Sequence, residues 1–154
     1  MSKEPIIIVG GEPNSVFLEI FFKCLKTSNF KSPLIIITSR KLLQKQMKKL
    51  AFAFKINNID RKIKDFSQLN NRKINLINVD YDFKKCFEKI TNKSNNYINK
   101  TFETALSVIR KNNLSKFING PVSKKHFLKG KSLGITEYLA KKTKKNKVAM
   151  LIFN

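Results

Sequence analysis

The chain has 154 residues, 42% of them hydrophobic, and its 32 lysines and arginines against 10 acidic residues give a formal net charge of +22. This composition excludes a disordered chain, and the length favours one domain with its own core. No apolar run approaches the roughly 18 residues of a membrane span. The short run Ile6–Val9 also follows the acidic Glu4, which argues against a signal peptide. We therefore expect a cytoplasmic protein.

The positive charge leaves two interpretations open. One is a basic nucleic-acid-binding protein, because a chain this basic attracts polyanions. Against it, the cations are mostly lysines, and arginine occurs only at Arg40, Arg61, Arg72 and Arg110. Base-edge and bidentate phosphate recognition favour arginine. The lysines are also spread along the chain among many asparagines and isoleucines, as A/T-rich coding bias would leave them on solvated faces, and we favour that second interpretation.

The N-terminal part of the chain alternates apolar runs with amphipathic segments. Pro5–Gly10 and Pro33–Thr38 are continuous apolar runs, which predict strands buried on both faces. A helix follows each strand, with apolar side chains at Val16, Phe17, Ile20, Phe21, Cys24 and Leu25 in the first and, after a Ser39 cap, at Leu42, Leu43, Met47, Leu50 and Ala51 in the second. Because Cys24 lies on the apolar face, we expect a buried, reduced thiol there. Cys24 and Cys86 do not have the spacing of a metal site.

The rest of the chain continues the alternation. The predicted elements are a short strand Phe52–Ile56, a loop Asn57–Lys73, a strand Ile74–Val79 nearer an edge, a long helix from Asn96 to Asn112, a strand Leu114–Asn119 and a last strand Val148–Phe153. Strands and helices that alternate in this way indicate an α/β fold with a mainly parallel sheet flanked by helices.

The stretch Ile118–Leu139 contains the best candidates for a binding site. It predicts the end of a buried strand, a break at Gly120-Pro121, a short helix, a loop, and a second helix opening at Thr136. Ligands of open α/β sheets bind beyond the carboxyl ends of the strands, and Lys124 comes directly after one such end. Thr136 is expected at a helix N-cap, where its hydroxyl either bonds a backbone N–H or, with the free N–H groups, holds an anion.

Two further residues are weaker candidates. Glu12 follows Gly10 and Gly11 at a strand-to-helix turn that matches neither GxGxxG nor GxxxxGK[ST], so the turn is either an anion site or a tight connection. We expect Glu12 to be a solvated loop carboxylate. His126 is the only histidine and has no cysteine or carboxylate cluster beside it, so we expect a surface or partly packed side chain and no metal ligand.

Gly120-Pro121-Val122-Ser123-Lys124 and Gly134-Ile135-Thr136-Glu137-Tyr138-Leu139-Ala140 resemble the central signature of the 4-hydroxythreonine-4-phosphate dehydrogenases of pyridoxal phosphate biosynthesis. That family reads Pro-(Ile/Val)-x-Lys and then Gly-His-Thr-Glu-(Phe/Tyr)-Leu-Ala. Gly11-Glu12-Pro13 is similar to the turn after the family's opening strand. The resemblance implies an isopropylmalate-dehydrogenase-like fold, of which residues 1–154 form the N-terminal portion, apparently truncated and without an internal boundary.

The same resemblance implies a function. It is an NAD-dependent oxidation, with decarboxylation, of 4-phosphooxy-L-threonine, assisted by a divalent metal such as Zn, Mg or Co. Thr136 and Lys124 inherit a role in substrate binding, whereas Ile135 stands where the family has histidine. The family's metal-binding histidines and much of its NAD site belong to the half that this chain lacks, so we assign no catalytic or metal residue here. A homodimer or a missing C-terminal half is the expected partner, and a non-catalytic domain that binds a phosphorylated metabolite or a partner is the alternative.

Overall fold

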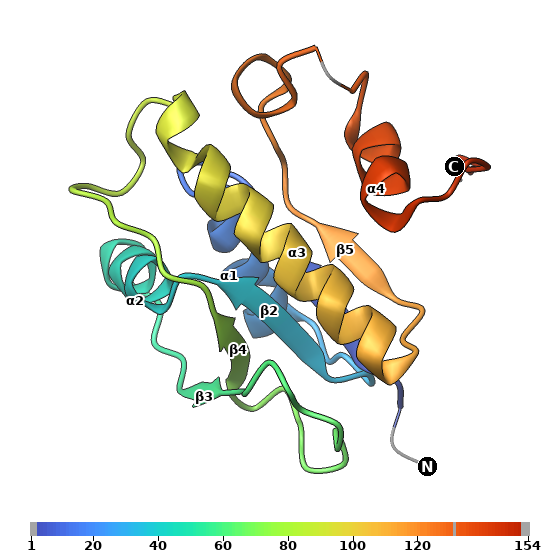
Figure 1. Ribbon diagram of the computed structural model, residues 1–154. Coiled ribbons are helices and arrows are strands. Elements are labelled where there is room, and N and C mark those ends of the chain that lie inside the picture. The colour runs from blue at the N-terminus through green and yellow to red at the C-terminus, as the bar shows by residue number, and fades with distance from the viewer. Residues whose placement is uncertain (1–2, 131, 152–154) are drawn as a thin grey trace.

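The computed structural model describes residues 3–130 and 132–151 (Figure 1). Within them, five strands form one sheet in the order β3-β4-β2-β1-β5, and every pairing is parallel. The strands are β1 (Ile6–Val9), β2 (Leu34–Thr38), β3 (Ile56–Asn58), β4 (Ile74–Asn78) and β5 (Phe117–Asn119). The helices are α1 (Phe17–Thr27), α2 (Arg40–Lys49), α3 (Asn95–Asn112) and α4 (Ile135–Thr143), with the short turns η1 (Asn92–Ser94) and η2 (Lys124–Leu128). The α/β fold expected from the sequence is confirmed.

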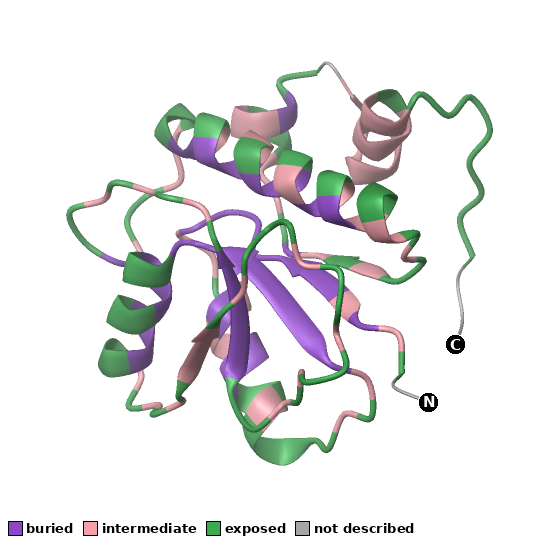
Figure 2. Ribbon diagram, turned by 60° about the horizontal axis from the view of Figure 1, so that its bottom comes forward, coloured by how far each residue is buried: buried purple, intermediate pink, exposed green. Residues whose placement is uncertain are grey.

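The sheet is covered on both faces, and its central strands are almost wholly buried (Figure 2). Successive side chains of a strand point to opposite faces. Ile8, Ile36 and Leu76 therefore pack with α1 and α2, whereas Ile7, Ile35 and Ile77 pack with α3 and with partly buried side chains of α4. This two-sided burial explains why continuous apolar runs, with no alternation, form β1 and β2.

The face that α1 buries differs from the expected one. Its buried side chains are Leu18, Phe21 and Phe22, whereas Val16 and Ile20 are 58% and 51% exposed. Cys24 is exposed too, so the expectation of a buried thiol there was wrong; the buried free cysteine is Cys86. The helix has apolar residues on most of its circumference, and the sheet covers only one of two possible stripes.

Two predicted strands are also corrected. Phe52 and Phe54 lie outside the sheet and pack on Phe22, with ring centroids 5.4 and 6.2 Å away, and the edge strand forms instead at Ile56–Asn58. The side chain of Asn57 bonds that of Asn75 at 3.1 Å, so Asn57-Asn58 is part of a strand and not a turn. Residues 148–151 are not in a strand, because no described strand pairs with them, and residues 152 and 153 lie outside the described range.

A buried tyrosine joins β2 to the start of α3. The Tyr97 hydroxyl lies 2.8 Å from the Thr38 hydroxyl and accepts a 3.1 Å hydrogen bond from the backbone N–H of Ser39. Ser39 in turn caps α2, as the sequence predicted, by accepting from the N–H of Leu42. These bonds fix the N-terminus of α3 over the carboxyl end of β2.

Burial raises the pKa of Tyr97 to about 12. Tyrosine titrates near pH 10 in the unfolded chain, so the unfolded state loses its proton first and stability falls as pH rises from about 10 to 12. A two-unit difference corresponds to roughly 2.7 kcal/mol. We expect wild type to lose about that much more unfolding free energy over this window than Tyr97→Phe. Denaturant titrations of both proteins at several alkaline pH values check this, and parallel pH profiles would contradict it.

Candidate functional site at the carboxyl ends of β1 and β5

The turns that follow β1 and β5 are in direct backbone contact. The N–H of Glu12 donates to the carbonyl of Pro121 at 2.8 Å, and the N–H of Gly120 donates to Val9 at 2.7 Å. A Cβ at Gly11, whose φ is +70°, would lie 2.4 Å from the Pro121 oxygen. A Cβ at Gly120 would lie 2.4 Å from the Gly10 oxygen. Both positions therefore require glycine, and the β1 turn is a tight connection to the neighbouring turn.

Glu12 is buried at this contact, with 3% of its surface exposed. One carboxylate oxygen accepts from the backbone N–H of Asn14 at 3.2 Å, and the other accepts from the Ser94 hydroxyl at 2.9 Å. The expectation of a solvated carboxylate was wrong. Its partner Ser94 is 82 residues away in sequence, so no local pattern could show the bond. Because a buried carboxylate needs such bonds, Glu12 ties the β1 turn to the N-terminus of α3.

The turn η2 is joined to the same region. The Asn95 side chain donates to the carbonyl of His126 at 2.7 Å, and the His126 ring nitrogen Nδ1 lies 3.3 Å from the Asn92 side-chain oxygen. Within η2, the Ser123 hydroxyl accepts from the N–H of His126 at 3.1 Å. His126 is partly buried, in agreement with the sequence interpretation. The segment after β5 is thus held against the start of α3.

The two sequence-predicted substrate residues follow β5 in this segment. Lys124 is the first residue of η2 and is exposed. Thr136 is half-buried in the first turn of α4, not at its N-cap, which is Gly134 in extended conformation (φ −154°). The expected capping role of Thr136 was therefore wrong. Its hydroxyl makes no hydrogen bond to the described part of the chain, nor is it bonded to Lys124. Neither side chain is engaged by another described residue.

Helix α4 lies on one flank of α3. The ring of Tyr138 meets Phe102 edge to face at 5.3 Å, and its hydroxyl donates to Asn99 at 2.9 Å. Lys142 bonds the Glu103 carboxylate at 2.8 Å, which lowers the pKa of that carboxyl. Ile135, where the resembled family has histidine, packs against the core on the α3 side. The isoleucine at this position therefore contributes packing and offers no hydrogen bond to a ligand.

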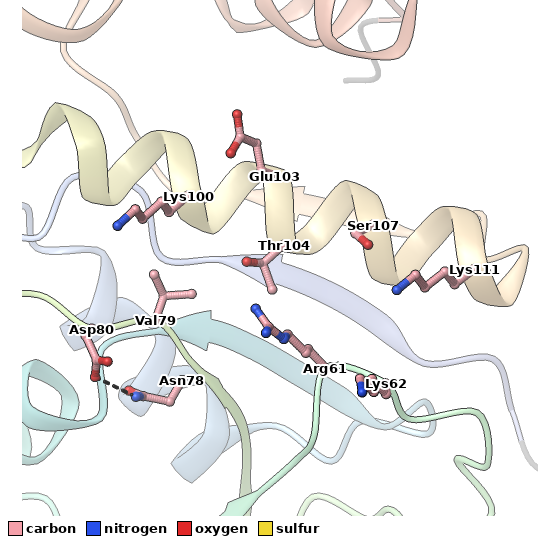
Figure 3. A pocket seen from close by; sticks show the side chains of 10 residues that line it. All are labelled: Arg61, Lys62, Asn78, Val79, Asp80, Lys100, Glu103, Thr104, Ser107 and Lys111. Carbon is pink, nitrogen blue, oxygen red and sulfur yellow. Dashed lines mark hydrogen bonds between the residues drawn. The ribbon is translucent and has the colours of Figure 1, made fainter.

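The opposite flank of α3 borders a cleft of about 650 Å³ that the sequence analysis missed (Figure 3). The cleft is lined from α3 by Lys100, Glu103, Thr104, Ser107 and Lys111, from the loop after β3 by Arg61 and Lys62, and from the end of β4 by Asn78, Val79 and Asp80. Four of the α3 residues, Lys100, Thr104, Ser107 and Lys111, recur at i, i+4, i+7 and i+11, which places them on one face of a helix. This spacing of polar residues along one helix face is the sequence feature that could have indicated the cleft.

The described residues contain no group of three or more histidine, cysteine, aspartate or glutamate side chains that could hold a metal ion. Residues 3–130 and 132–151 therefore do not bring together the several ligand side chains that a divalent cation requires. The glycines of the β1 turn are in contact with Gly120 and Pro121 and offer no cradle for a dinucleotide. The described residues alone therefore do not fit the metal, and the β1 turn does not fit NAD.

These features define a parallel α/β protein with a candidate ligand site at the carboxyl edge of its sheet. The model of one family, described as pyridoxal phosphate biosynthetic protein PdxA, matches residues 29–154. The chain belongs to that family. The match includes Lys124 and Thr136 but not the turn at Glu12.

Solved structures share this fold. A 4-hydroxythreonine-4-phosphate dehydrogenase from Burkholderia phymatum has a TM-score of 0.75 and 19% identity over 96% of this chain and 46% of its own. A 4-hydroxythreonine-4-phosphate dehydrogenase from Klebsiella pneumoniae has a TM-score of 0.74 and 16% identity over 92% of this chain and 45% of its own. The chain thus spans less than half the length of either protein. No curated protein matches it in sequence.

Proposed function

We propose that the chain is the substrate-holding part of an oxidoreductase of the 4-hydroxythreonine-4-phosphate dehydrogenase type. The family match over residues 29–154 is the observation that carries this proposal. In addition, Lys124 and Thr136 follow the carboxyl end of β5. In this proposal the Lys124 ammonium and the Thr136 hydroxyl bind 4-phosphooxy-L-threonine, with the ammonium serving its phosphate as a point charge. The first turn of α4 adds free backbone N–H groups.

The oxidation itself would use NAD and a divalent metal, as the resemblance to the 4-hydroxythreonine-4-phosphate dehydrogenases implies. The described residues offer no donor set for the metal, so a second polypeptide or a further part of the protein would supply it. We assign no chemical step to this chain. Its own residues bind and orient the substrate.

The open edge at β5 supports the need for a partner. β5 is the last strand of the sheet order, so one side of its backbone is unpaired within the described residues. Ile118 on this strand is 46% exposed, and the first turn of α1 contacts the end of β5, because a Cβ at Gly120 would lie 3.0 Å from the Phe17 ring. The exposed Val16 and Ile20 belong to that same end of α1. We propose that a second copy of the chain or the complementary half of the enzyme covers this edge.

A non-catalytic domain that binds a phosphorylated metabolite is the second candidate function. The packing of Ile135 against the core favours it, because a histidine contact to substrate is replaced by an apolar one. The two candidates share the binding site and differ in turnover. Assaying NADH formation with NAD, metal and substrate, with and without the complementary half of a related enzyme, separates them.

Substrate titrations of variants test the site. Removing the charge in Lys124→Gln is expected to weaken 4-phosphooxy-L-threonine binding about tenfold, since a charged hydrogen bond contributes about 1.5–3 kcal/mol. Thr136→Val should weaken binding about two- to tenfold, as expected for a neutral hydrogen bond. Calorimetry checks both values.

Lys125→Gln is the matched control, because Lys125 is the exposed neighbour of Lys124 in the same turn. It should bind as wild type does. If Lys124→Gln and Lys125→Gln weakened binding equally, substrate affinity would depend only on the overall positive charge of the turn. The assignment of Lys124 would then be wrong.

A further inference from the structure

The cleft between α3, the loop after β3 and the end of β4 is cationic and separate from the site beyond β5. Four of its lining residues are cations: Arg61, Lys62, Lys100 and Lys111. The only ion pairs between described residues are Lys23–Glu19 and Lys142–Glu103, so none of these four cations is neutralised by a carboxylate. Like charges held around one concavity repel each other, and a bound anion relieves that repulsion.

The two acidic residues of the cleft weaken this field only in part. Glu103 points away from the other lining side chains in Figure 3, and its carboxylate is engaged by Lys142 and Asn99 at 2.8 Å each. Asp80 accepts a 2.9 Å hydrogen bond from the side chain of Asn78. Among the lining residues, four cations therefore stand against one carboxylate that no lysine or arginine engages, that of Asp80. The net field of the cleft is positive.

Neutral donors complete the site. Arg61 reaches from its loop toward Thr104 on α3, and Ser107 lies one helical turn further along (Figure 3). Hydroxyls placed between a guanidinium and ammonium groups can share the oxygens of one phosphate group. The guanidinium fork suits phosphate geometry in particular.

The lining also indicates the size and kind of the ligand. A cleft of about 650 Å³ is in the range of small-molecule sites. No aromatic side chain lines it, and Val79 is its only apolar residue. Single-stranded nucleic acids and nucleobases are usually held by stacking on aromatic rings. The lining therefore suits a small phosphorylated molecule better than a nucleic acid.

The cleft and the site beyond β5 are on different flanks of α3. Asn99 and Phe102 contact α4, whereas Lys100, Thr104, Ser107 and Lys111 line the cleft. Glu103 lies at the border, because it lines the cleft and bonds Lys142 of α4. We propose that this cleft is a second anion site, which binds a small molecule bearing a phosphate or diphosphate group through Arg61, Lys100 and the hydroxyls of Thr104 and Ser107. It does not depend on the dehydrogenase assignment.

Inorganic pyrophosphate is the probe for this site. Calorimetry on the full chain at fixed ionic strength should show saturable binding that weakens about tenfold or more in the double variant Arg61→Gln/Lys100→Gln. The matched control is Lys41→Gln/Arg72→Gln, which removes the same two charges from exposed positions outside the cleft. Its affinity should stay within about twofold of wild type, because distant surface charges are screened by salt. All substituted side chains are exposed, so both variants should fold, and their melting temperatures verify it.

Three outcomes would overturn the proposal. Wild type could fail to bind pyrophosphate saturably, or both double variants could lose affinity equally, which would reduce the effect to net charge. The third is tighter binding of an oligonucleotide of about ten deoxythymidines that only the cleft variant loses, which would make the cleft a nucleic-acid site. Lys125→Gln, an exposed lysine outside the cleft, should leave pyrophosphate binding unchanged.

Discussion

Gly11→Ala is expected to destabilise the protein by about 2–5 kcal/mol, the sum of a left-handed backbone penalty of about 1–2 and overpacking of about 1–3 kcal/mol. The added Cβ would lie 2.4 Å from the Pro121 oxygen and 2.7 Å from the Gly120 carbonyl carbon. These are backbone atoms, so they cannot rotate away. The two turns that carry the candidate site would have to separate, and substrate binding should weaken with stability.

Gly130→Ala is the control for this prediction. Gly130 has nearly the same φ, +71°, but a Cβ there would meet no atom within 4 Å. It should therefore cost only the backbone penalty, about 1–2 kcal/mol. Denaturant unfolding of both variants measures the difference. Equal losses would mean that the contact between the turns is not as tight as described.

Phe102→Ala is expected to cost about 3–5 kcal/mol, the range for truncating a buried phenylalanine. Phe102 is fully buried. The centroid of its ring lies 6.2 Å from that of Phe117 on β5, 6.2 Å from that of Phe127 in η2 and 5.3 Å from that of Tyr138 on α4. This one side chain therefore packs against all three elements that follow α3. Its loss should release α4, which has no fully buried residue of its own.

Phe22→Ala provides the comparison, because Phe22 is equally buried on the opposite face of the sheet. Both variants should lose similar global stability, as measured by denaturant unfolding. Only Phe102→Ala should also lose amide exchange protection in α4 beyond the global change, together with affinity for 4-phosphooxy-L-threonine. If both variants affected α4 to the same extent, Phe102 would have no special role in seating it.

Within residues 3–130 and 132–151, no helix is long and apolar enough to cross a membrane. The cleft at α3 concentrates part of the +22 charge of the chain. The affinity of the cleft for pyrophosphate, compared with that for oligonucleotide, bears directly on the two interpretations of this charge.

Local sequence was sufficient for the central strands, for the N-cap of α2 and for the end of α3. β1 and β2 are continuous apolar runs, and a strand covered on both faces buries such a run better than an amphipathic element does. Ser39 was identified because its partner, Leu42, is three residues away. Asn113 ends α3 in the left-handed conformation that asparagine tolerates.

Features that depend on distant partners could not be predicted in this way. Glu12 is buried because Ser94 meets it from another element. Cys24 is exposed because the sheet covers the Phe21–Phe22 side of an α1 that is apolar on several sides. The edge strand shifted to Ile56–Asn58 because Phe52 and Phe54 pack more favourably on Phe22 than they would at a sheet edge. The cleft needed three separate segments to be brought together.

The site beyond β5 is tested most directly by mapping backbone amide shifts in an NMR titration with 4-phosphooxy-L-threonine. If Lys124 and Thr136 hold this molecule, the largest shifts will occur in Lys124–Leu128 and in the first turn of α4. Shifts confined to the cleft-lining residues between Lys100 and Lys111, or no shifts while pyrophosphate still binds, would contradict the assignment of Lys124 and Thr136 to substrate.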